Sequence, residues 1–269
     1  MTFSNRTAKP LAQQPIIVLG AGIIGCAIAY KLLQDGYAVI TIADNLPGSQ
    51  NVYYPSQWAG ASWHISKEGS EEFKHMQAIT HRVWSKFRNE DGPECGVMPV
   101  HMTEYFETLP KEESSAWGGN LTHVRVINRK EQVEANNSGR PLPAPYKATI
   151  EYGSLVVDPN YHLPYIKKKL EQLGARFVQK QVQALSDLHS MFPESRIFVN
   201  ASGCGSKDLL DVLDDKCFWE RGQNIFYKTD KTNQCIIGHA SAPKEYTYVI
   251  PRPLQGGVIL GGVKQPGNL

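Results

Sequence analysis

Apolar and polar positions follow two different periods in the first 45 residues. The apolar run at residues 15–19 (PIIVL) ends at a glycine and predicts a buried parallel strand. The Ala- and Leu-rich stretch after it (CAIAYKLLQDG) predicts a helix that ends near Gly36. Residues 37–43 (YAVITIA) predict a second strand, which ends before Asp44. Together these segments predict a complete β-turn-α-β unit.

Helical spacing returns at residues 68–90. The apolar face of this predicted helix is interpreted as core packing, and it consists of Phe73, Met76, Thr80, Val83, Trp84 and Phe87. Another helix is predicted to begin at Asp158-Pro159, with Pro in the first turn, and to end at Gly174. Ser206 is predicted to cap a short helix that contains residues 209–213.

The rest of the chain is dominated by strand signals and turns. Residues 91–157 predict a β-rich region with a loop at 136–145, and residues 45–63 predict irregular structure. Further strands are expected at 176–182 and 196–200, and four alternating runs within 217–263 (NIFYK, CIIGH, YTYVI and GVILGG) predict an antiparallel sheet. This order predicts an α/β fold in which a Rossmann-like dinucleotide-binding domain is interrupted by a second, β-rich domain.

Composition and charge exclude several classes of function. Of the 269 residues, 41% are apolar, which is enough to bury a core. The net charge of +2 gives no electrostatic reason to expect a nucleic-acid or membrane partner. The mean hydropathy is −0.35, and the absence of a run of about 20 apolar residues argues against a spanning helix. No secretory signal is recognised, and five cysteines without a CxxC pair favour a reducing compartment over a disulfide framework or a zinc site.

The turn after the first strand carries the motif Gly20-Ala21-Gly22-Ile23-Ile24-Gly25. In such a motif the first glycine permits a tight turn, the second leaves room for a pyrophosphate, and the third lets the helix pack close to the strand. The N–H groups at the start of the helix then face the phosphates. Asp44, 19 residues after Gly25, is placed to accept both ribose hydroxyls and would repel a 2′-phosphate. The motif predicts an adenine-dinucleotide site and leaves FAD and NAD open.

Four further segments distinguish these cofactors by resemblance. They are SQWAGASW at 56–63, VNASGCGS at 199–206, RGQ at 221–223, and YVIPRP at 248–253 followed by two glycines. In order and spacing, over residues 15–268, the set resembles the FAD-dependent D-amino-acid oxidases, with D-aspartate oxidases as close relatives.

The resemblance implies roles for particular residues and domains. It implies an FAD-binding domain at residues 15–95 and 150–215, and a substrate domain with a mixed antiparallel β-sheet at 96–149 and 216–269. Tyr248 matches the tyrosine whose hydroxyl binds the substrate carboxylate. The implied FAD-binding residues are Gly20, Ala21, Gly22, Ile23, Ile24, Gly25, Asp44, Gln57, Ala59, Gly60, Ser62, Val182, Ala201, Ser202 and Gly203.

The implied reaction is oxidation of a D-amino acid to an imino acid, which hydrolyses to a 2-oxo acid and ammonia. The flavin accepts a hydride and is reoxidised by oxygen, which yields hydrogen peroxide. Neutral D-amino acids are the default substrates, and His64, Arg252 and His239 are candidate cations for an acidic one. The family is peroxisomal; no C-terminal peroxisomal tripeptide is present, and a cytoplasmic location is otherwise expected. A homodimer is left open.

One departure from the family pattern affects the expected activity. The family's substrate-binding arginine follows the strand matched by residues 256–264, in a segment that is absent here, as is the last flavin-binding strand. Loss of one buried charge-assisted contact costs on the order of 2–5 kcal/mol. The polypeptide alone is therefore expected to bind FAD weakly and to turn over poorly or not at all. The alternative is a catalytically inactive dinucleotide-binding or interaction protein; an NAD-linked dehydrogenase would predict further βα units after Asp44, where a β-rich insertion is found instead.

Overall fold

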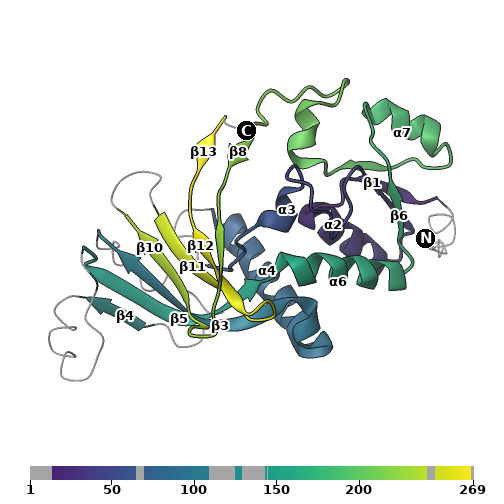
Figure 1. The fold of residues 1–269 in the computed structure, drawn as a ribbon. Coiled ribbons are helices and arrows are strands. Elements are labelled where there is room, and N and C mark those ends of the chain that lie inside the picture. The colour runs from purple at the N-terminus through teal and green to yellow at the C-terminus, as the bar shows by residue number, and fades with distance from the viewer. Residues whose placement is uncertain are drawn as a thin grey trace, which may run out of the picture. The chain divides into compact units, whose positions relative to one another are not determined.

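The computed structural model describes residues 14–64, 70–108, 125–128, 143, 145–240 and 246–267. Its contacts divide the chain into two compact units (Figure 1). Unit 1 comprises Met1–Ala59 and Pro159–Trp219, and unit 2 comprises Gly60–Asp158 and Glu220–Leu269. The predicted boundaries placed residues 60–95 and 150–158 in the first domain and 216–219 in the second. The contacts group the first two ranges with unit 2 and the last with unit 1.

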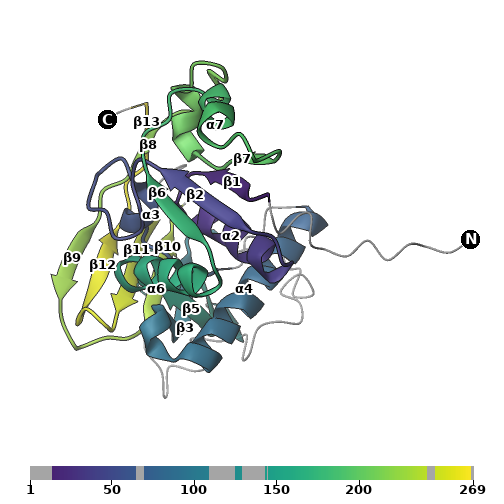
Figure 2. The ribbon, with the colours of Figure 1, turned by 90° about the vertical axis from the view of Figure 1, so that its right-hand side faces the viewer.

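Unit 1 contains a parallel sheet of four strands in the order β6-β2-β1-β7, which lie side by side in Figure 2. Its strands are β1 (Ile16–Leu19), β2 (Val39–Ala43), β6 (Arg176–Gln179) and β7 (Phe198–Asn200). Its helices are α2 (Ile23–Gln34), α3 (Pro55–Trp58), α6 (Pro159–Gln172), α7 (Leu185–Met191) and the 3-10 helix η3 (Gly203–Lys207). The predicted β-turn-α-β unit is confirmed as β1, α2 and β2, and the predicted helix start at Pro159 is confirmed as well.

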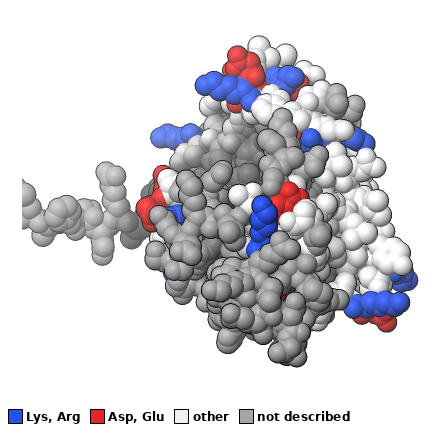
Figure 3. Space-filling model, turned by 90° about the vertical axis from the view of Figure 1, so that its left-hand side faces the viewer, with Lys and Arg blue, Asp and Glu red and all other residues white. Residues whose placement is uncertain are grey.

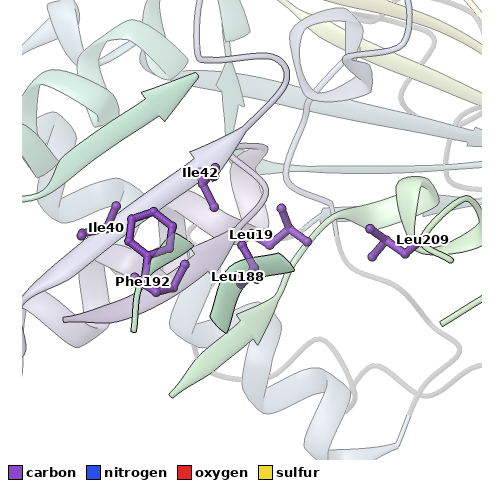
Figure 4. Packing of buried hydrophobic residues seen from close by; sticks show 7 residues of the cluster. Leu19, Ile40, Ile42, Leu188, Phe192 and Leu209 are labelled. Carbon is purple, nitrogen blue, oxygen red and sulfur yellow. The ribbon is translucent and has the colours of Figure 1, made fainter. Parts of the chain in front are cut away.

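The core of unit 1 lies between this sheet and α7. Both β1 and β2 are buried at every position, as expected of parallel strands covered on both faces. Figure 4 shows residues of this apolar cluster from β1, β2, α7 and the segment after η3. The cluster consists of Ile17, Leu19, Ile40, Ile42, Leu188, Phe192 and Leu209. This packing fixes the strand ends that carry the glycine turn.

Unit 2 contains a sheet of seven strands in the order β4-β5-β3-β10-β11-β12-β9. The strands are β3 (Val97–Phe106), β4 (Arg125–Asn128), β5 (Ala148–Val157), β9 (Ile225–Lys228), β10 (Cys235–His239), β11 (Tyr246–Arg252) and β12 (Gly257–Gly261). All adjacent pairs are antiparallel except β10 with β3. A separate pair joins β8 (Glu220–Arg221) to β13 (Gln265–Pro266). The predicted antiparallel strands at the end of the chain are confirmed.

The long helix α4 (Glu71–Asp91) belongs to unit 2 and is followed by the 3-10 helix η1 (Pro93–Cys95). The helix is confirmed, but its apolar stripe is only partly core. Phe87 is buried, whereas Phe73 is 40% and Met76 is 50% exposed. The core interpretation is therefore wrong for the first half of the stripe, and the contacts of α4 with β3, β5 and η1 account for burial in its second half.

Two other local predictions were wrong or incomplete. Ser206 does not cap a helix, because it lies inside η3 and residues 209–213 form turns. Helix α7 was not predicted, and its cap explains why: the carboxylate of Asp211 accepts hydrogen bonds from the backbone of Leu185 (2.8 Å) and Ser186 (2.9 Å). These bonds also lower the pKa of Asp211. This part of the cap comes from 26 residues away and leaves no local sequence signal, whereas the local part, the Asp187 carboxylate that accepts from the Ala184 amide at 3.1 Å, did not by itself identify the helix.

Two surface properties concern the partner classes considered above. Within the described ranges, no helix combines the length and apolarity needed to cross a membrane. On the face drawn in Figure 3, the described acidic and basic side chains are interspersed.

The predicted loop at 136–145 lies almost wholly outside the described residues.

Candidate functional site

The glycine turn of unit 1 lies between β1 and α2, at the carboxyl ends of the parallel strands. Gly20 has a φ of +108°, and a Cβ there would be 2.2 Å from the backbone oxygen of Ala201. The amide of Ala201, just after β7, donates to the oxygen of Leu19 at 2.8 Å. Only glycine fits this approach. Two predicted cofactor segments, far apart in the sequence, therefore meet at one edge of the sheet.

The start of α2 is close-packed on one side and open on the other. At Gly25 a Cβ would be 2.0 Å from the backbone oxygen of Gly20, so the helix lies directly on the turn. Gly22 is the N-cap, and a Cβ there would meet, among the described residues, only the hydroxyl of Ser56 at 3.1 Å. That hydroxyl accepts a hydrogen bond from the amide of Ile23 at 3.0 Å. A helix N-terminus with this space beside it fits a pyrophosphate.

Two buried side chains donate hydrogen bonds to the backbone of this turn. The backbone oxygen of Ala21 accepts hydrogen bonds from the Tyr54 hydroxyl (2.7 Å) and the Cys26 thiol (3.4 Å). Burial raises the pKa of Cys26 to about 12 and also raises the pKa of Tyr54. Both groups therefore keep their protons at neutral pH and remain donors. In contrast, the side chain of Ile24 is 67% exposed.

The acidic residue predicted to bind ribose lies at the same edge of the sheet. Asp44 directly follows β2, and its exposed carboxylate accepts a hydrogen bond from the Asn45 amide at 3.2 Å. The side chain of Gln179, at the end of β6, donates to the backbone oxygen of Asp44 at 3.0 Å. Val182 is partly buried and packs against the core cluster of unit 1.

The turn after β7 is organised by Asn200. Its side-chain oxygen accepts hydrogen bonds from the backbone (3.1 Å) and the hydroxyl (2.7 Å) of Ser202. The Ser202 and Ser206 hydroxyls are 2.9 Å apart, and Gly203 begins η3 with a φ of +59°. This turn stands beside the glycine motif because β7 pairs with β1.

Helix α3 contributes one buried polar side chain, Gln57, which is 3% exposed. Its amide nitrogen donates to the side-chain oxygen of Asn160 at 2.5 Å, which ties α3 to α6. The amide oxygen of Gln57 accepts no hydrogen bond from any described residue. Ala59 is the C-cap of α3 and the last residue of this part of unit 1.

In unit 2 the continuation of this loop runs antiparallel to the end of β5. Ala61 accepts from the amide of Val157 at 2.9 Å, and the amide of Trp63 donates to Leu155 at 2.8 Å. Ser62 forms an isolated bridge with Val156. Ser154 adds a hydrogen bond from its hydroxyl to the oxygen of Trp63. Gly60 and Ser62 are thus held against the sheet that carries Tyr248.

Tyr248 lies in β11 with its ring packed among three glycines. A Cβ at Gly60 would be 3.5 Å from the Tyr248 hydroxyl, and one at Gly261 or Gly262 would be 2.4 Å or 2.6 Å from the ring. The hydroxyl donates to the side-chain oxygen of Asn224 at 2.5 Å. The structure thus brings together Gly60 and Tyr248, two predicted site residues 188 positions apart.

The three candidate cations have different surroundings. Arg252 is 2% exposed and lies 3.9 Å from the carboxylate of Asp158. His239 is 2.7 Å from Glu104 and stacks on the ring of Phe106. His64 is exposed. Arg252 and His239 are therefore already engaged by carboxylates of the protein itself.

Sequence reasoning missed two residues of this arrangement. Ser56 lies inside a quoted motif, and Asn224 directly follows one, but no spacing rule singles out either. Their hydrogen bonds, to Ile23 and Tyr248, join positions 33 and 24 residues apart. Such pairs become visible only in the folded structure.

The parallel sheet, the glycine turn open at Gly22 and the acidic residue after the second strand define a dinucleotide-binding protein. A family profile described as FAD dependent oxidoreductase (DAO) matches residues 15–268. The chain belongs to this DAO family of FAD-dependent oxidoreductases, and the cradle at Gly20, Gly22 and Gly25 fits that cofactor.

Individual relatives agree with this family. The chain is 28% identical over 256 residues to a D-amino-acid oxidase of Schizosaccharomyces pombe, covering 94% of this chain and 70% of the relative. It is 23% identical over 284 residues to a D-aspartate oxidase of Talaromyces thermophilus, covering 94% and 71%. The glycine oxidase of Geobacillus kaustophilus has a similar fold, with a TM-score of 0.67, 16% identity, and coverage of 94% of this chain and 72% of the other.

Proposed function

We propose that this protein oxidises D-amino acids with FAD and molecular oxygen, which yields an imino acid and hydrogen peroxide. The imino acid then hydrolyses to a 2-oxo acid and ammonia. The observation that carries the proposal is the packing of Tyr248 beside Gly60, a predicted FAD-binding residue of the SQWAGASW segment at 56–63. The named D-amino-acid and D-aspartate oxidases support it from the side of sequence.

In this proposal unit 1 is the FAD-binding domain. The amides at the start of α2 would donate hydrogen bonds to the pyrophosphate beside Gly22, where a larger side chain would take the space. The carboxylate of Asp44 accepts the ribose hydroxyls. The turn at Ala201, Ser202 and Gly203 lines the same edge of the sheet because β7 pairs with β1. FAD, when bound, supplies the hydride acceptor that no side chain provides.

Unit 2 is proposed as the substrate domain, with Tyr248 as its carboxylate-binding residue. Its hydroxyl donates a hydrogen bond to one carboxylate oxygen of the amino acid. Because the ring is held among Gly60, Gly261 and Gly262, the hydroxyl has a fixed position. A fixed carboxylate orients the Cα–H of the substrate, and such orientation contributes several kcal/mol to lowering the barrier.

The test uses the full chain, titrated with FAD by flavin fluorescence and then assayed for peroxide with pairs of D- and L-amino acids. Peroxide from D-alanine or D-aspartate, and none from the L-forms, is the expected result. The Tyr248→Phe variant is expected to lose about 10- to 100-fold in kcat/KM, since a hydrogen bond to a charged group contributes about 1.5–3 kcal/mol. Tyr227→Phe is the matched control, because Tyr227 is 60% exposed on β9.

Two outcomes of this assay would contradict the proposal. FAD binding without peroxide from any amino acid would contradict the oxidase and favour the inactive dinucleotide-binding protein. Equal loss in Tyr248→Phe and Tyr227→Phe would remove Tyr248 from the site. The FAD titration and the rate of peroxide production together also test the expectation that the polypeptide alone binds FAD weakly and turns over poorly. Comparison of D-alanine with D-aspartate decides between neutral and acidic substrates.

A further inference from the structure

Arg252 is a cation buried within unit 2, at the end of β11. Only 2% of it is exposed, and its guanidinium reaches in several directions. One terminal nitrogen donates to the backbone oxygen of Gly60 at 2.6 Å, and the other to that of Pro251 at 3.4 Å. Burial lowers the pKa of the guanidinium, and the charge of Asp158 opposes that shift. The charge is therefore retained where it has partners on more than one side.

Asp158 anchors this cation to the sheet of unit 2. It is 2% exposed and follows β5, and its amide donates to the oxygen of Gly96 at 2.8 Å. One carboxylate oxygen lies 3.9 Å from Arg252 Nε and accepts a hydrogen bond from the Gln255 side chain at 2.7 Å. Removal of one partner of a buried ion pair leaves the other charge uncompensated, so Arg252 and Asp158 depend on each other.

Gly60 is the point at which this anchor meets the predicted site. The next residues are fixed to β5 through Ala61 and Trp63, but these bonds do not hold the carbonyl of Gly60. Arg252 does so from β11, four residues after Tyr248. Gly60 in turn lies against the Tyr248 ring and Ile250, where a Cβ would be 3.5 Å and 3.2 Å from them. A rotation of the Gly60 peptide would therefore move both the loop and the tyrosine.

We propose that Arg252 is a positioning residue that holds the Gly60 carbonyl, and through it fixes residues 60–63 of the SQWAGASW segment and the Tyr248 hydroxyl. The expected effect of Arg252 on FAD binding rests on the proposed function, whereas the hydrogen bond from Arg252 to Gly60 does not. It replaces the expectation that Arg252 is a cation for an acidic substrate. Lysine cannot reproduce this arrangement, because a single ammonium group cannot reach Gly60 and Asp158 with the geometry of a guanidinium.

The test compares Arg252→Met and Arg252→Lys with the wild type and with Arg82→Met, which removes an exposed arginine from α4. Hydrogen exchange is measured on the full chain without FAD, and the Kd for FAD is measured by fluorescence titration. In Arg252→Met the amides of Trp63 and Val157 are expected to exchange at least tenfold faster than in wild type. The exchange rates of the amides in β12 are expected to change less or not at all. The FAD Kd is expected to rise at least tenfold, and KM for the amino acid to rise more than kcat falls. Arg252→Lys is expected to lie between Arg252→Met and wild type, and Arg82→Met to match wild type.

The outcomes separate this proposal from the proposed function. Exchange at Trp63 and Val157 unchanged in both Arg252 variants would overturn the proposal, and so would a uniform increase throughout unit 2. If Arg252→Met does not fold, Arg252→Lys decides by the same exchange measurement. A wild-type chain that binds no FAD would count against the proposed function, while the exchange result would still decide whether Arg252 holds the loop.

Discussion

Substitution of Gly25 by alanine sets two effects of opposite sign against each other. Gly25 is the third residue of α2, and it is buried. A Cβ at this position would be 2.0 Å from the backbone oxygen of Gly20 and 2.9 Å from its carbonyl carbon. Both obstacles belong to the backbone of the turn, so no side-chain rotation relieves them.

The relative sizes of the helix-propensity gain and the steric cost decide whether the free energy of unfolding rises or falls. Alanine is favoured over glycine inside a helix by about 1 kcal/mol. The contact to the Gly20 oxygen, however, falls 1.4 Å short of an ordinary separation of 3.4 Å. Overpacking costs about 1–3 kcal/mol, and a rigid obstacle places this site at the upper end of that range. The net loss in the free energy of unfolding is expected to be about 2 kcal/mol.

The assay is urea unfolding of the full chain without FAD, followed by FAD titration. Ala27→Gly is the matched control, because Ala27 is an exposed residue of the same helix and its change measures the propensity alone. That control is expected to lose about 1 kcal/mol. Gly25→Ala must shift the start of α2 to be accommodated, so its Kd for FAD is expected to rise at least tenfold. Ala27→Gly is expected to leave the FAD Kd within threefold of wild type.

An opposite sign would refute this reasoning. If Gly25→Ala were more stable than wild type by the amount that Ala27→Gly loses, propensity alone would govern the site. An unchanged FAD Kd in Gly25→Ala would mean that the packing of α2 on the Gly20 turn is not needed for the cofactor.

Three other predictions concern groups described above. Asn224→Ala is expected to lower KM for the amino acid about 2- to 10-fold in steady-state assays, because Asn224 competes for the single Tyr248 O–H proton and a hydrogen bond contributes about 0.5–1.5 kcal/mol. Asp44→Asn is expected to raise the FAD Kd at least tenfold in fluorescence titration, since a charged acceptor becomes neutral. The buried Cys26 thiol has its pKa raised from 9.0 to about 12, so the unfolded chain loses this proton first as the pH rises. The free energy of unfolding is therefore expected to fall between pH 9 and 12, and to fall less steeply in Cys26→Ala, as measured by urea unfolding across that range.

The elements that the sequence predicts well are those stabilised by their own neighbours. β1, α2 and β2 follow from a buried apolar run, a helix-forming stretch and another run, and each has a glycine or aspartate at its end. Helix α7 was missed because it is short and much of its cap comes from the distant Asp211. The exposed start of α4 was misjudged because periodicity alone does not say how far a sheet extends. In both cases the missing information is tertiary.

The candidate site shows the same division between backbone and side chains. The glycines were predictable because a tight turn and a close approach require that residue type at Gly20, Gly22 and Gly25 whatever lies around them. Ser56 and Asn224 were not, because serine and asparagine fit many surroundings and their partners, 33 and 24 residues away, are set by the tertiary fold. Tyr248 was found only through the resemblance of its segment to a family.

Arg252 shows why a charged residue near a predicted pocket is a poor guide to substrate charge. From the sequence, Arg252 is a candidate for the additional cation that an acidic D-amino acid would need. In the structure its nitrogens face Gly60, Pro251 and Asp158. To bind a substrate it would have to leave Asp158 without this partner, and breaking a buried ion pair in this way costs about 3–5 kcal/mol. That cost exceeds the gain of about 1.5–3 kcal/mol from a hydrogen bond to a carboxylate, so the binding of an acidic substrate side chain by Arg252 is disfavoured.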